Sequence, residues 1–148
     1  MASRLMKEYK VLQNQALDDI LLHPIDESDL LRWVAYIKGP PDTPYEGGKF
    51  TIEITVPSNY PLAPPVFKFV TKIFHPNIHF KTGEICLDLL KTSWSAIYTL
   101  ESVCRSIIAL LAAPEPDSPL NCDAGNLLRG GDTKGHDSLA KMYTRIYA

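Results

Sequence analysis

FTIEITV, residues 50–56, decides the fold class of this chain. Apolar and polar residues alternate along it without a break, so that one face carries Phe50, Ile52, Ile54 and Val56. A period of two is typical of an antiparallel strand that packs one face on a core and exposes the other. LLRWVAYIK at 30–38 and VFKFV at 66–70 fit as its neighbours, and the turn-rich GPPDTPYEGG joins the first pair. These segments predict an antiparallel meander.

Helical periodicity flanks this sheet on both sides. Apolar residues recur every three or four positions between 3 and 17, and Ser3 is a candidate N-cap. After residue 99 the same period predicts a strongly apolar helix that ends before PEPDSP, followed by helices near 121–129 and 137–147. The order of one helix, three or four strands, an irregular segment and further helices predicts an α+β layer fold.

The composition limits the classes of function. The chain has 148 residues, of which 45% are hydrophobic, and this fits one domain spanning 1–148 with a single core. Lysine and arginine number 15 against 17 aspartate and glutamate residues, so we expect no nucleic-acid partner. No apolar run is long enough for a membrane span, and the first ten residues lack a signal-peptide pattern. We therefore expect a soluble cytoplasmic protein that meets membranes only through a partner.

The segment PSNYPLAPP, residues 57–65, contains four prolines. Proline lacks the backbone N–H and fixes its own φ, so this segment is predicted to be an extended, rigid loop rather than a helix. Such a loop holds its exposed side chains in fixed positions. It is either a docking surface or a plain rigid connector.

The three cysteines, Cys86, Cys104 and Cys122, are an odd number at unrelated spacings. We therefore predict neither a disulfide framework nor a metal site. Cys104 falls on the apolar face of the predicted helix near 100–113, which indicates a structural thiol. Cys122 lies in the polar stretch NCDAG at a helix start, and we expect it to be a surface thiol without a role in the chemistry.

Cys86 lies in an irregular segment just after the turn residues Thr82-Gly83. Most free cysteines are small buried apolar residues, but an irregular loop can also give a thiol the exposure that reactivity needs. As a hydrolytic nucleophile it would need a histidine base, for which His75 and His79 are candidates, with Asn77 nearby. Alternatively, the thiol carries an acyl group and passes it on. The residues alone leave a cysteine hydrolase and a thiol carrier both open.

The residues around Cys86 resemble the motif of the ubiquitin-conjugating enzymes: His75-Pro76-Asn77, then Gly83, then ICLD at 85–88, then Trp94. The resemblance covers essentially the whole chain, including the basic first helix, GPPDTPYEGGKF, YPLAPP and PEPDSPL. It implies the ubiquitin-conjugating-enzyme fold, an α+β fold with an N-terminal helix, a four-stranded antiparallel meander, a central helix and C-terminal helices.

The resemblance also implies a mechanism. Cys86 accepts the C-terminal carboxyl of ubiquitin from the thioester of the activating enzyme, and holds it until a substrate nucleophile attacks. Asn77 donates its side-chain amide to the resulting oxyanion, or braces the loop that makes this possible. His75, Pro76 and Trp94 are implied to be structural. No cofactor is expected, because ATP is used by the upstream activating enzyme.

Three departures from the family pattern fall close to Cys86. Asn77 precedes it by nine residues (86 − 77 = 9), one more than is usual in the family. Trp94 is followed by Ser95-Ala96, where the family often has serine and proline. The acidic residue that often stands at the mouth of the active site is Ser118 here, with Asp117 beside it. Either Asp117 takes over the acid's task, or the acceptor is a nucleophile that needs less help, such as a thiol.

Within the family, these departures and the stretches SRLMKEYKVL, PIDESDLLRW and GNLLRGGD look like the peroxisomal ubiquitin-conjugating enzymes of yeasts. That likeness implies work at the cytosolic face of the peroxisomal membrane, recruitment by a membrane-anchored peroxin, and the peroxisomal import receptor as substrate. The alternatives are a general cytosolic enzyme for ubiquitin or a related modifier, a non-catalytic binding module of the ubiquitin pathway, and a cysteine hydrolase.

The resemblance also assigns a partner surface. It would bind the activating enzyme and RING-type ubiquitin ligases through Arg4, Lys7, Leu62, Ser95 and Ala96. Leu62 stands where the family often has an aromatic anchor, which indicates a weaker or different contact with the ligase; the alternative is an ordinary loop leucine. The binding face for the recruiter is not predicted.

Overall fold

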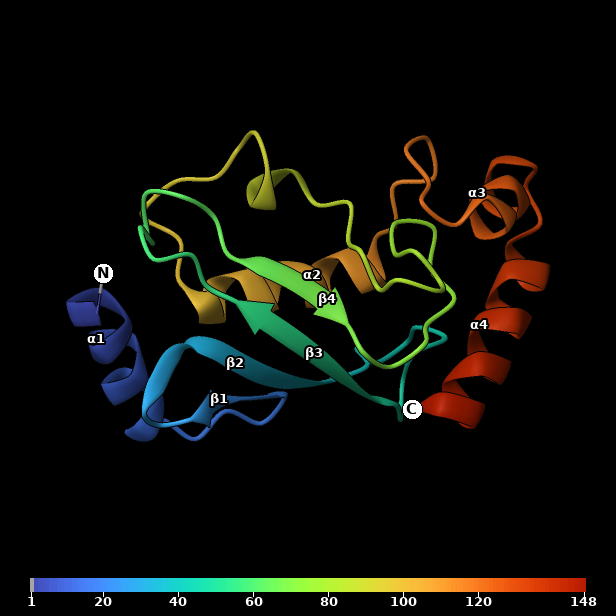
Figure 1. Ribbon diagram of the computed structural model, residues 1–148. Helices are drawn as coiled ribbons and strands as arrows, with labels where there is room; N and C mark the ends of the chain where they lie inside the picture. The colour runs from blue at the N-terminus through green and yellow to red at the C-terminus, as the bar shows by residue number, and fades with distance from the viewer. Residues whose placement is uncertain (1) are drawn as a thin grey trace.

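The computed structural model describes residues 2–148, with side chains from Arg4 onward. Along the chain the elements are α1 (Ala2–Gln13), β1 (Ile20–Asp26), β2 (Asp29–Lys38), β3 (Lys49–Thr55), β4 (Val66–Phe69), the 3-10 turn η1 (Asp88–Leu90), α2 (Leu100–Ala112), α3 (Cys122–Arg129) and α4 (Thr133–Tyr147). Figure 1 shows α1 at one end of the sheet, α2 against one face of it, and α3 and α4 at the other end. The predicted α+β architecture is confirmed.

The sheet is a four-stranded antiparallel meander in the order β1-β2-β3-β4. In β3, Ile52 lies opposite Ala35 of β2 and Phe69 of β4, and all three are buried. Phe50 and Ile54 share that face, as the alternation predicted, while Glu53 is exposed on the other. The meander brings β1, which the sequence prediction did not place, to the outer edge of the sheet beside β2.

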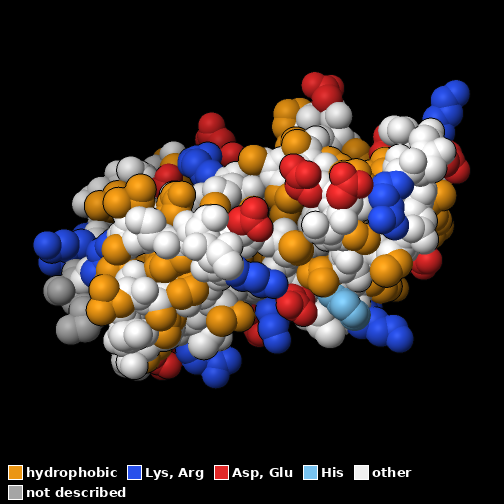
Figure 2. All heavy atoms as spheres, turned by 90° about the horizontal axis from the view of Figure 1, so that it is seen from above, with side chains coloured by type: hydrophobic (Ala, Val, Ile, Leu, Met, Phe, Trp, Pro, Cys, Tyr) orange, Lys and Arg blue, Asp and Glu red, His pale blue; other side chains and the backbone are white. Residues whose placement is uncertain are grey.

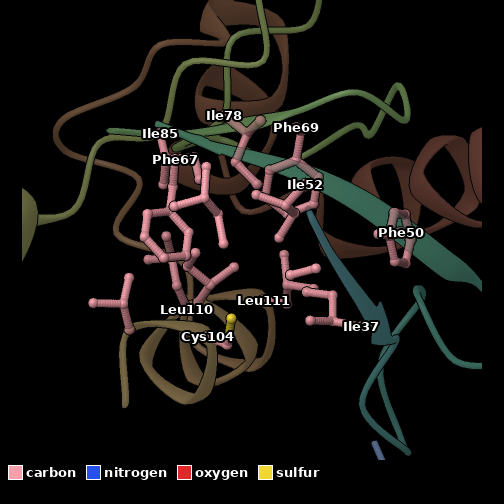
Figure 3. Close-up of a cluster of buried hydrophobic side chains, with 14 of the residues drawn as sticks. Ile37, Phe50, Ile52, Phe67, Phe69, Ile78, Ile85, Cys104, Leu110 and Leu111 are labelled. Carbon is pink, nitrogen blue, oxygen red and sulfur yellow. The ribbon is translucent and has the colours of Figure 1, made fainter. Parts of the chain in front are cut away.

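The main core lies between this sheet and α2. Thr99 begins the helix by accepting a hydrogen bond from the Ser102 N–H, and the Ser102 side chain accepts one from the Thr99 N–H. Six side chains of α2 are buried: Leu100, Val103, Cys104, Ile107, Leu110 and Leu111. Figure 3 shows Cys104, Leu110 and Leu111 facing the apolar side chains of β3 and β4. Burial of this apolar face is what stabilises the helix.

Two predicted helix bounds were wrong. The first helix ends at Gln13 rather than near 17, because the chain there turns toward the sheet, which begins at Ile20. The last helix begins at Thr133, since Asp132 caps it by accepting a hydrogen bond from the Gly135 N–H. The suggested cap at Ser3 lies outside the side chains that the structure describes.

The irregular segment between β4 and α2 is fixed to the core at several points. Ile78 pairs with both His75 and Ile85 in short bridges, and Ile78 and Ile85 are buried. Gly83 has φ +76° and packs against β4, where a Cβ would lie 1.9 Å from the Phe69 carbonyl oxygen, so only glycine fits. These contacts hold the segment that carries Cys86. None of the helices within residues 2–148 has the length and apolar character that a membrane span requires.

Candidate active site

Cys86 and Asn77 are held side by side by their backbones. The Cys86 N–H donates to the Asn77 carbonyl oxygen at 2.8 Å. The residues between them form a closed turn, in which the His79 N–H donates to the Glu84 carbonyl at 2.9 Å. Although this turn is one residue longer than is usual in the family, Cys86 and Asn77 therefore still lie next to each other.

The Cys86 side chain is partly exposed and lines a groove of about 660 Å³. One wall is the segment from Cys86 through η1 to Ser93, and α2 contributes Ser106, Ala109 and Leu110. The groove is completed by Asn77, Ala113, Glu115 and Ser118. A thiol in such a place is reachable by a second macromolecule while its backbone stays fixed.

The Asn77 side chain is buried and braces the loop across the groove from Cys86. Its Nδ2 donates to the carbonyl oxygens of Glu115 at 2.8 Å and Ser118 at 3.2 Å. Its Oδ1 accepts from the Glu115 N–H at 2.8 Å. Both hydrogens of the Asn77 side-chain amide are thus hydrogen-bonded in the structure. Of the two roles that the sequence allowed for Asn77, this arrangement corresponds to bracing the loop.

His75 is fully buried and holds the backbone rather than serving as a base. Its Nε2 lies 2.8 Å from the Leu110 carbonyl oxygen, and its Nδ1 accepts from the Asn77 N–H at 3.0 Å. These bonds require a neutral ring protonated on Nε2. Burial lowers the pKa of His75 to about 4. The carbonyl of Pro76 accepts from the N–H groups of Leu120 and Asn121, which ties the same turn to α3.

The hydrolase hypothesis finds no base at Cys86. His79 turns its Nδ1 to the N–H groups of Lys81 and Thr82 and lines a different hollow, beside Cys122. No histidine lines the groove of Cys86 within the described part of the chain. A histidine-activated thiol of the hydrolase type is therefore not assembled here.

Two acidic residues line the groove that sequence reasoning did not single out, Asp88 and Glu115. Both are exposed, as are Ser118 and Asp117. Ser118 lines the groove as predicted, whereas Asp117 is not among the residues that form its wall. Figure 2 looks onto this face of the molecule and shows acidic side chains gathered over its middle. The only signal for Glu115 in the sequence is its place between two prolines in PEPDSP.

The comparisons agree with this geometry. Residues 4–144 match the family model described as ubiquitin-conjugating enzyme. The chain belongs to the ubiquitin-conjugating enzyme family. It is 82% identical over 147 residues to ubiquitin-conjugating enzyme E2 pex4 of Dictyostelium discoideum, covering 99% of each chain. It is 60% identical to the protein peroxin-4 of Arabidopsis thaliana, with 99% of this chain and 94% of that one covered.

Solved ubiquitin-conjugating enzymes share the fold. The Pex4p enzyme of H. polymorpha, determined in complex with the soluble domain of Pex22p, superposes with a TM-score of 0.94. Its sequence is 39% identical, with 99% of this chain and 97% of that chain covered. These likenesses confirm the family resemblance and its peroxisomal branch as predicted from the motifs.

In this ubiquitin-conjugating enzyme, Trp94 joins two loops. Its Nε1 donates to the Pro61 carbonyl oxygen at 2.9 Å, and its ring lies against those of Tyr60 and Tyr98. The proline-rich loop is therefore rigidly attached to the loop after Trp94, which supports the structural role that the motif implied.

Among the residues predicted to form the partner surface, Arg4 faces inward. Its guanidinium donates to the carbonyl oxygens of Ala96 at 2.8 Å and Tyr98 at 2.6 Å and pairs with Glu8. Lys7 and Ala96 are exposed, and Ser95 is half-buried with its Oγ accepting from the Ile97 N–H. Leu62 is 79% exposed and the unpredicted Ile97 is 80% exposed. The sequence could not predict the exposure of Ile97, because this exposure depends on the turn after Trp94 and not on a periodic pattern.

The other two thiols lie as the sequence predicted. Cys104 is buried in the core, and this burial raises its pKa to about 12. Cys122 is exposed at the first turn of α3, where the Asn121 side chain caps the helix. Among the described residues no group of three or more histidine, cysteine, aspartate or glutamate side chains is placed to hold a metal ion.

Proposed function

We propose that this enzyme accepts ubiquitin on Cys86 as a thioester and transfers it to a substrate cysteine or lysine. The observation that carries the proposal is the partly exposed Cys86 thiol, framed by Asn77 in a groove on a fixed backbone. In the charging step the Cys86 thiolate attacks the carbonyl carbon of the activating enzyme's ubiquitin thioester. A new C–S bond forms, the old C–S bond breaks, and the activating enzyme's cysteine leaves as a thiolate. Because the incoming carbonyl is already activated, this exchange needs no histidine base at Cys86.

The second part of the proposal concerns place and substrate. The likeness to the pex4 and peroxin-4 proteins supports a role in peroxisome biogenesis. The H. polymorpha relative in complex with Pex22p supports recruitment by a membrane-anchored peroxin to the cytosolic face of the peroxisomal membrane. There the enzyme would act with RING-type ligases on the peroxisomal import receptor, so that the receptor is recycled. A general cytosolic ubiquitin-conjugating enzyme is the alternative.

A charging assay tests the chemistry. The purified chain is incubated with ubiquitin, the activating enzyme and ATP, and the products are separated with and without reductant. We expect an adduct that reductant removes, that is absent in Cys86→Ala, and that becomes resistant to reductant in Cys86→Ser because an oxyester replaces the thioester. Cys122→Ala, which removes the other exposed thiol, is the control and should charge normally. An adduct that survives in Cys86→Ala and disappears in Cys122→Ala would contradict the proposal.

The peroxisomal role is tested in cells that express this protein. The chain is depleted and replaced by wild type or by Cys86→Ala, and ubiquitin conjugates of the import receptor are measured in the peroxisomal membrane fraction. We expect the conjugates to return with wild type only. If receptor conjugates are unaffected by depletion while other conjugates fall, the general cytosolic alternative holds.

A further inference from the structure

A buried tyrosine outside the groove binds the segment that leads into Asn77. Tyr45 belongs to the connection between β2 and β3 and is 1% exposed. Its hydroxyl donates to the carbonyl oxygen of Phe74 at 2.7 Å, although the two residues are 29 positions apart. Among the described residues, no other group donates a hydrogen bond to this carbonyl. The hydroxyl of Tyr45 therefore anchors the peptide group between Phe74 and His75.

The ring of Tyr45 also packs on the side chain of His75. The two ring centroids are 5.7 Å apart, and the ring planes are inclined by 40°. The same imidazole is hydrogen-bonded to the Leu110 carbonyl through Nε2 and to the Asn77 N–H through Nδ1. Tyr45 therefore contacts both the backbone and the side chain of the segment that precedes Asn77.

Tyr45 is itself held firmly by its own connection. The Gly48 N–H donates to the Tyr45 carbonyl oxygen at 3.0 Å. A Cβ on Gly39 would lie 1.7 Å from that oxygen, so only glycine allows this close approach. Burial raises the pKa of Tyr45 above its ordinary value, so the hydroxyl keeps its proton and remains a donor. The anchor on Phe74 is thus built into the rigid β2–β3 connection.

Consecutive hydrogen bonds lead from this anchor to the reactive residue. Tyr45 fixes the peptide group before His75, and the His75 ring accepts from the Asn77 N–H at 3.0 Å. The Asn77 carbonyl in turn accepts from the Cys86 N–H at 2.8 Å. A rotation of the peptide group between Phe74 and His75 would therefore displace both Asn77 and Cys86.

We propose that Tyr45 is a positioning residue for the transfer of ubiquitin from Cys86, an assignment that rests on the thioester chemistry proposed above. Its hydroxyl keeps Asn77 and the Cys86 thioester in the geometry from which an acceptor attacks. In transfer to a thiol, the acceptor thiolate attacks the thioester carbonyl carbon and forms a new C–S bond. The bond to Cys86 breaks with its electron pair on sulfur. Tyr45 does not line the groove, so it acts on the rate of this step without contacting the acceptor.

Single-turnover discharge of the purified thioester tests this assignment. Wild type and Tyr45→Phe, which lacks only the hydroxyl, are charged with ubiquitin and then mixed with 2-mercaptoethanol or free lysine. We expect both discharge rates to fall by about 10-fold in Tyr45→Phe, because a displacement as small as 1 Å can cost about 100-fold. The extent of charging should be unchanged. Circular dichroism at the assay temperature verifies that each variant is folded.

Tyr60→Phe is the matched control. It removes another buried hydroxyl with a 2.7 Å hydrogen bond, but this bond is made to Glu8 of α1 and not to the turn before Cys86. The discharge step contains no partner protein, so we expect Tyr60→Phe to lose stability and to discharge at the wild-type rate. Equal slowing in the two variants would show a general effect of lost stability, and the proposal would be wrong.

Hydrogen exchange of the uncharged proteins gives a second measurement that a general loss of stability does not reproduce. We expect the Cys86 amide of Tyr45→Phe to exchange about 10-fold faster relative to the amides of β3, and that of Tyr60→Phe to keep the wild-type ratio. Slower discharge without this local change, or slowing with only one acceptor, would contradict positioning through the backbone. A wild type that does not charge would overturn the proposed function itself, whereas a charged Tyr45→Phe with normal discharge overturns only this inference.

Discussion

Asn77 binds three neighbouring parts of the structure through its backbone and its side chain. Its backbone carbonyl positions Cys86, its N–H orients His75, and its side-chain amide holds the 115–118 loop. Hydrogen bonds of a buried amide are costly to leave unmade, about 1–3 kcal/mol for each group. The turn before Cys86 and the loop across the groove therefore behave as one unit.

The burial of His75 leads to a prediction about the stability of the fold at acid pH. Its pKa falls from 6.5 to about 4 on folding because the ring is buried. Below pH 6.5 the unfolded chain binds a proton there and the folded chain does not, so this stability is complete above pH 6.5 and is lost as the pH falls toward 4. We expect His75 to lower the free energy of unfolding by about 2 kcal/mol between pH 6.5 and 5. Urea unfolding at several pH values measures it.

The comparison variant is His75→Gln, which keeps an amide donor for the Leu110 carbonyl but does not titrate. It should be less stable than wild type at pH 7 and should lose less stability between pH 6.5 and 5. Equal losses in the two proteins would show that His75 is not the buried neutral group described here.

At the scale of whole elements, one buried carboxylate of α1 binds two other parts of the fold. Glu8 is 8% exposed, and it accepts hydrogen bonds from the Leu100 N–H at 2.8 Å and the Tyr60 hydroxyl at 2.7 Å. Arg4 pairs with the same carboxylate. The first helix, the proline-rich loop and the start of α2 therefore meet at a single polar cluster.

On α1, Arg4 binds a neighbouring loop whereas Lys7 is exposed, so substitutions of these two residues should differ in their effect on stability. Arg4→Ala removes two charge-assisted hydrogen bonds to the loop after Trp94, so we expect the free energy of unfolding to fall by about 1–2 kcal/mol. Lys7→Ala removes an exposed charge and should change it by less than about 0.5 kcal/mol. Denaturant unfolding measures both. An unaltered stability in Arg4→Ala would mean that its contacts with Ala96 and Tyr98 contribute nothing.

At the scale of the whole molecule, the sheet and α2 enclose one core, and Cys104 lies inside it. Its burial and its pKa of about 12 keep it in the unreactive thiol form. We expect an alkylating reagent to modify Cys86 and Cys122 rapidly in the folded chain, and Cys104 only on global unfolding. Mass spectrometry of peptides from protein labelled with and without urea gives the rates.

The dependence of Cys104 labelling on urea should follow the unfolding curve measured by circular dichroism. Labelling of Cys104 at low urea, at a rate like that of Cys122, would show that α2 opens separately from the sheet. The single core would then be divided into two units.

The sequence by itself predicted most of the elements and singled out Cys86 as the candidate reactive residue. Alternation in residues 50–56 and helical spacing in α2 are local patterns, because burial of one face is what both periods record. The family could also be recognised from the sequence, because the motif around Cys86 and Asn77 is a local run of residues. What the sequence left unresolved were element ends, such as those of α1 and α4, since capping and the path of the chain decide them.

Only the tertiary structure decided which side chains meet. Asn77 and Glu115 are 38 residues apart, and Arg4 and Ala96 are 92 apart, yet each pair is hydrogen-bonded. Nothing in a local pattern tells an exposed guanidinium from one that caps a distant loop, or places Glu115 rather than Asp117 on the groove. Such contacts depend on how the elements pack, because packing sets the distance and direction between groups that the chain itself does not relate.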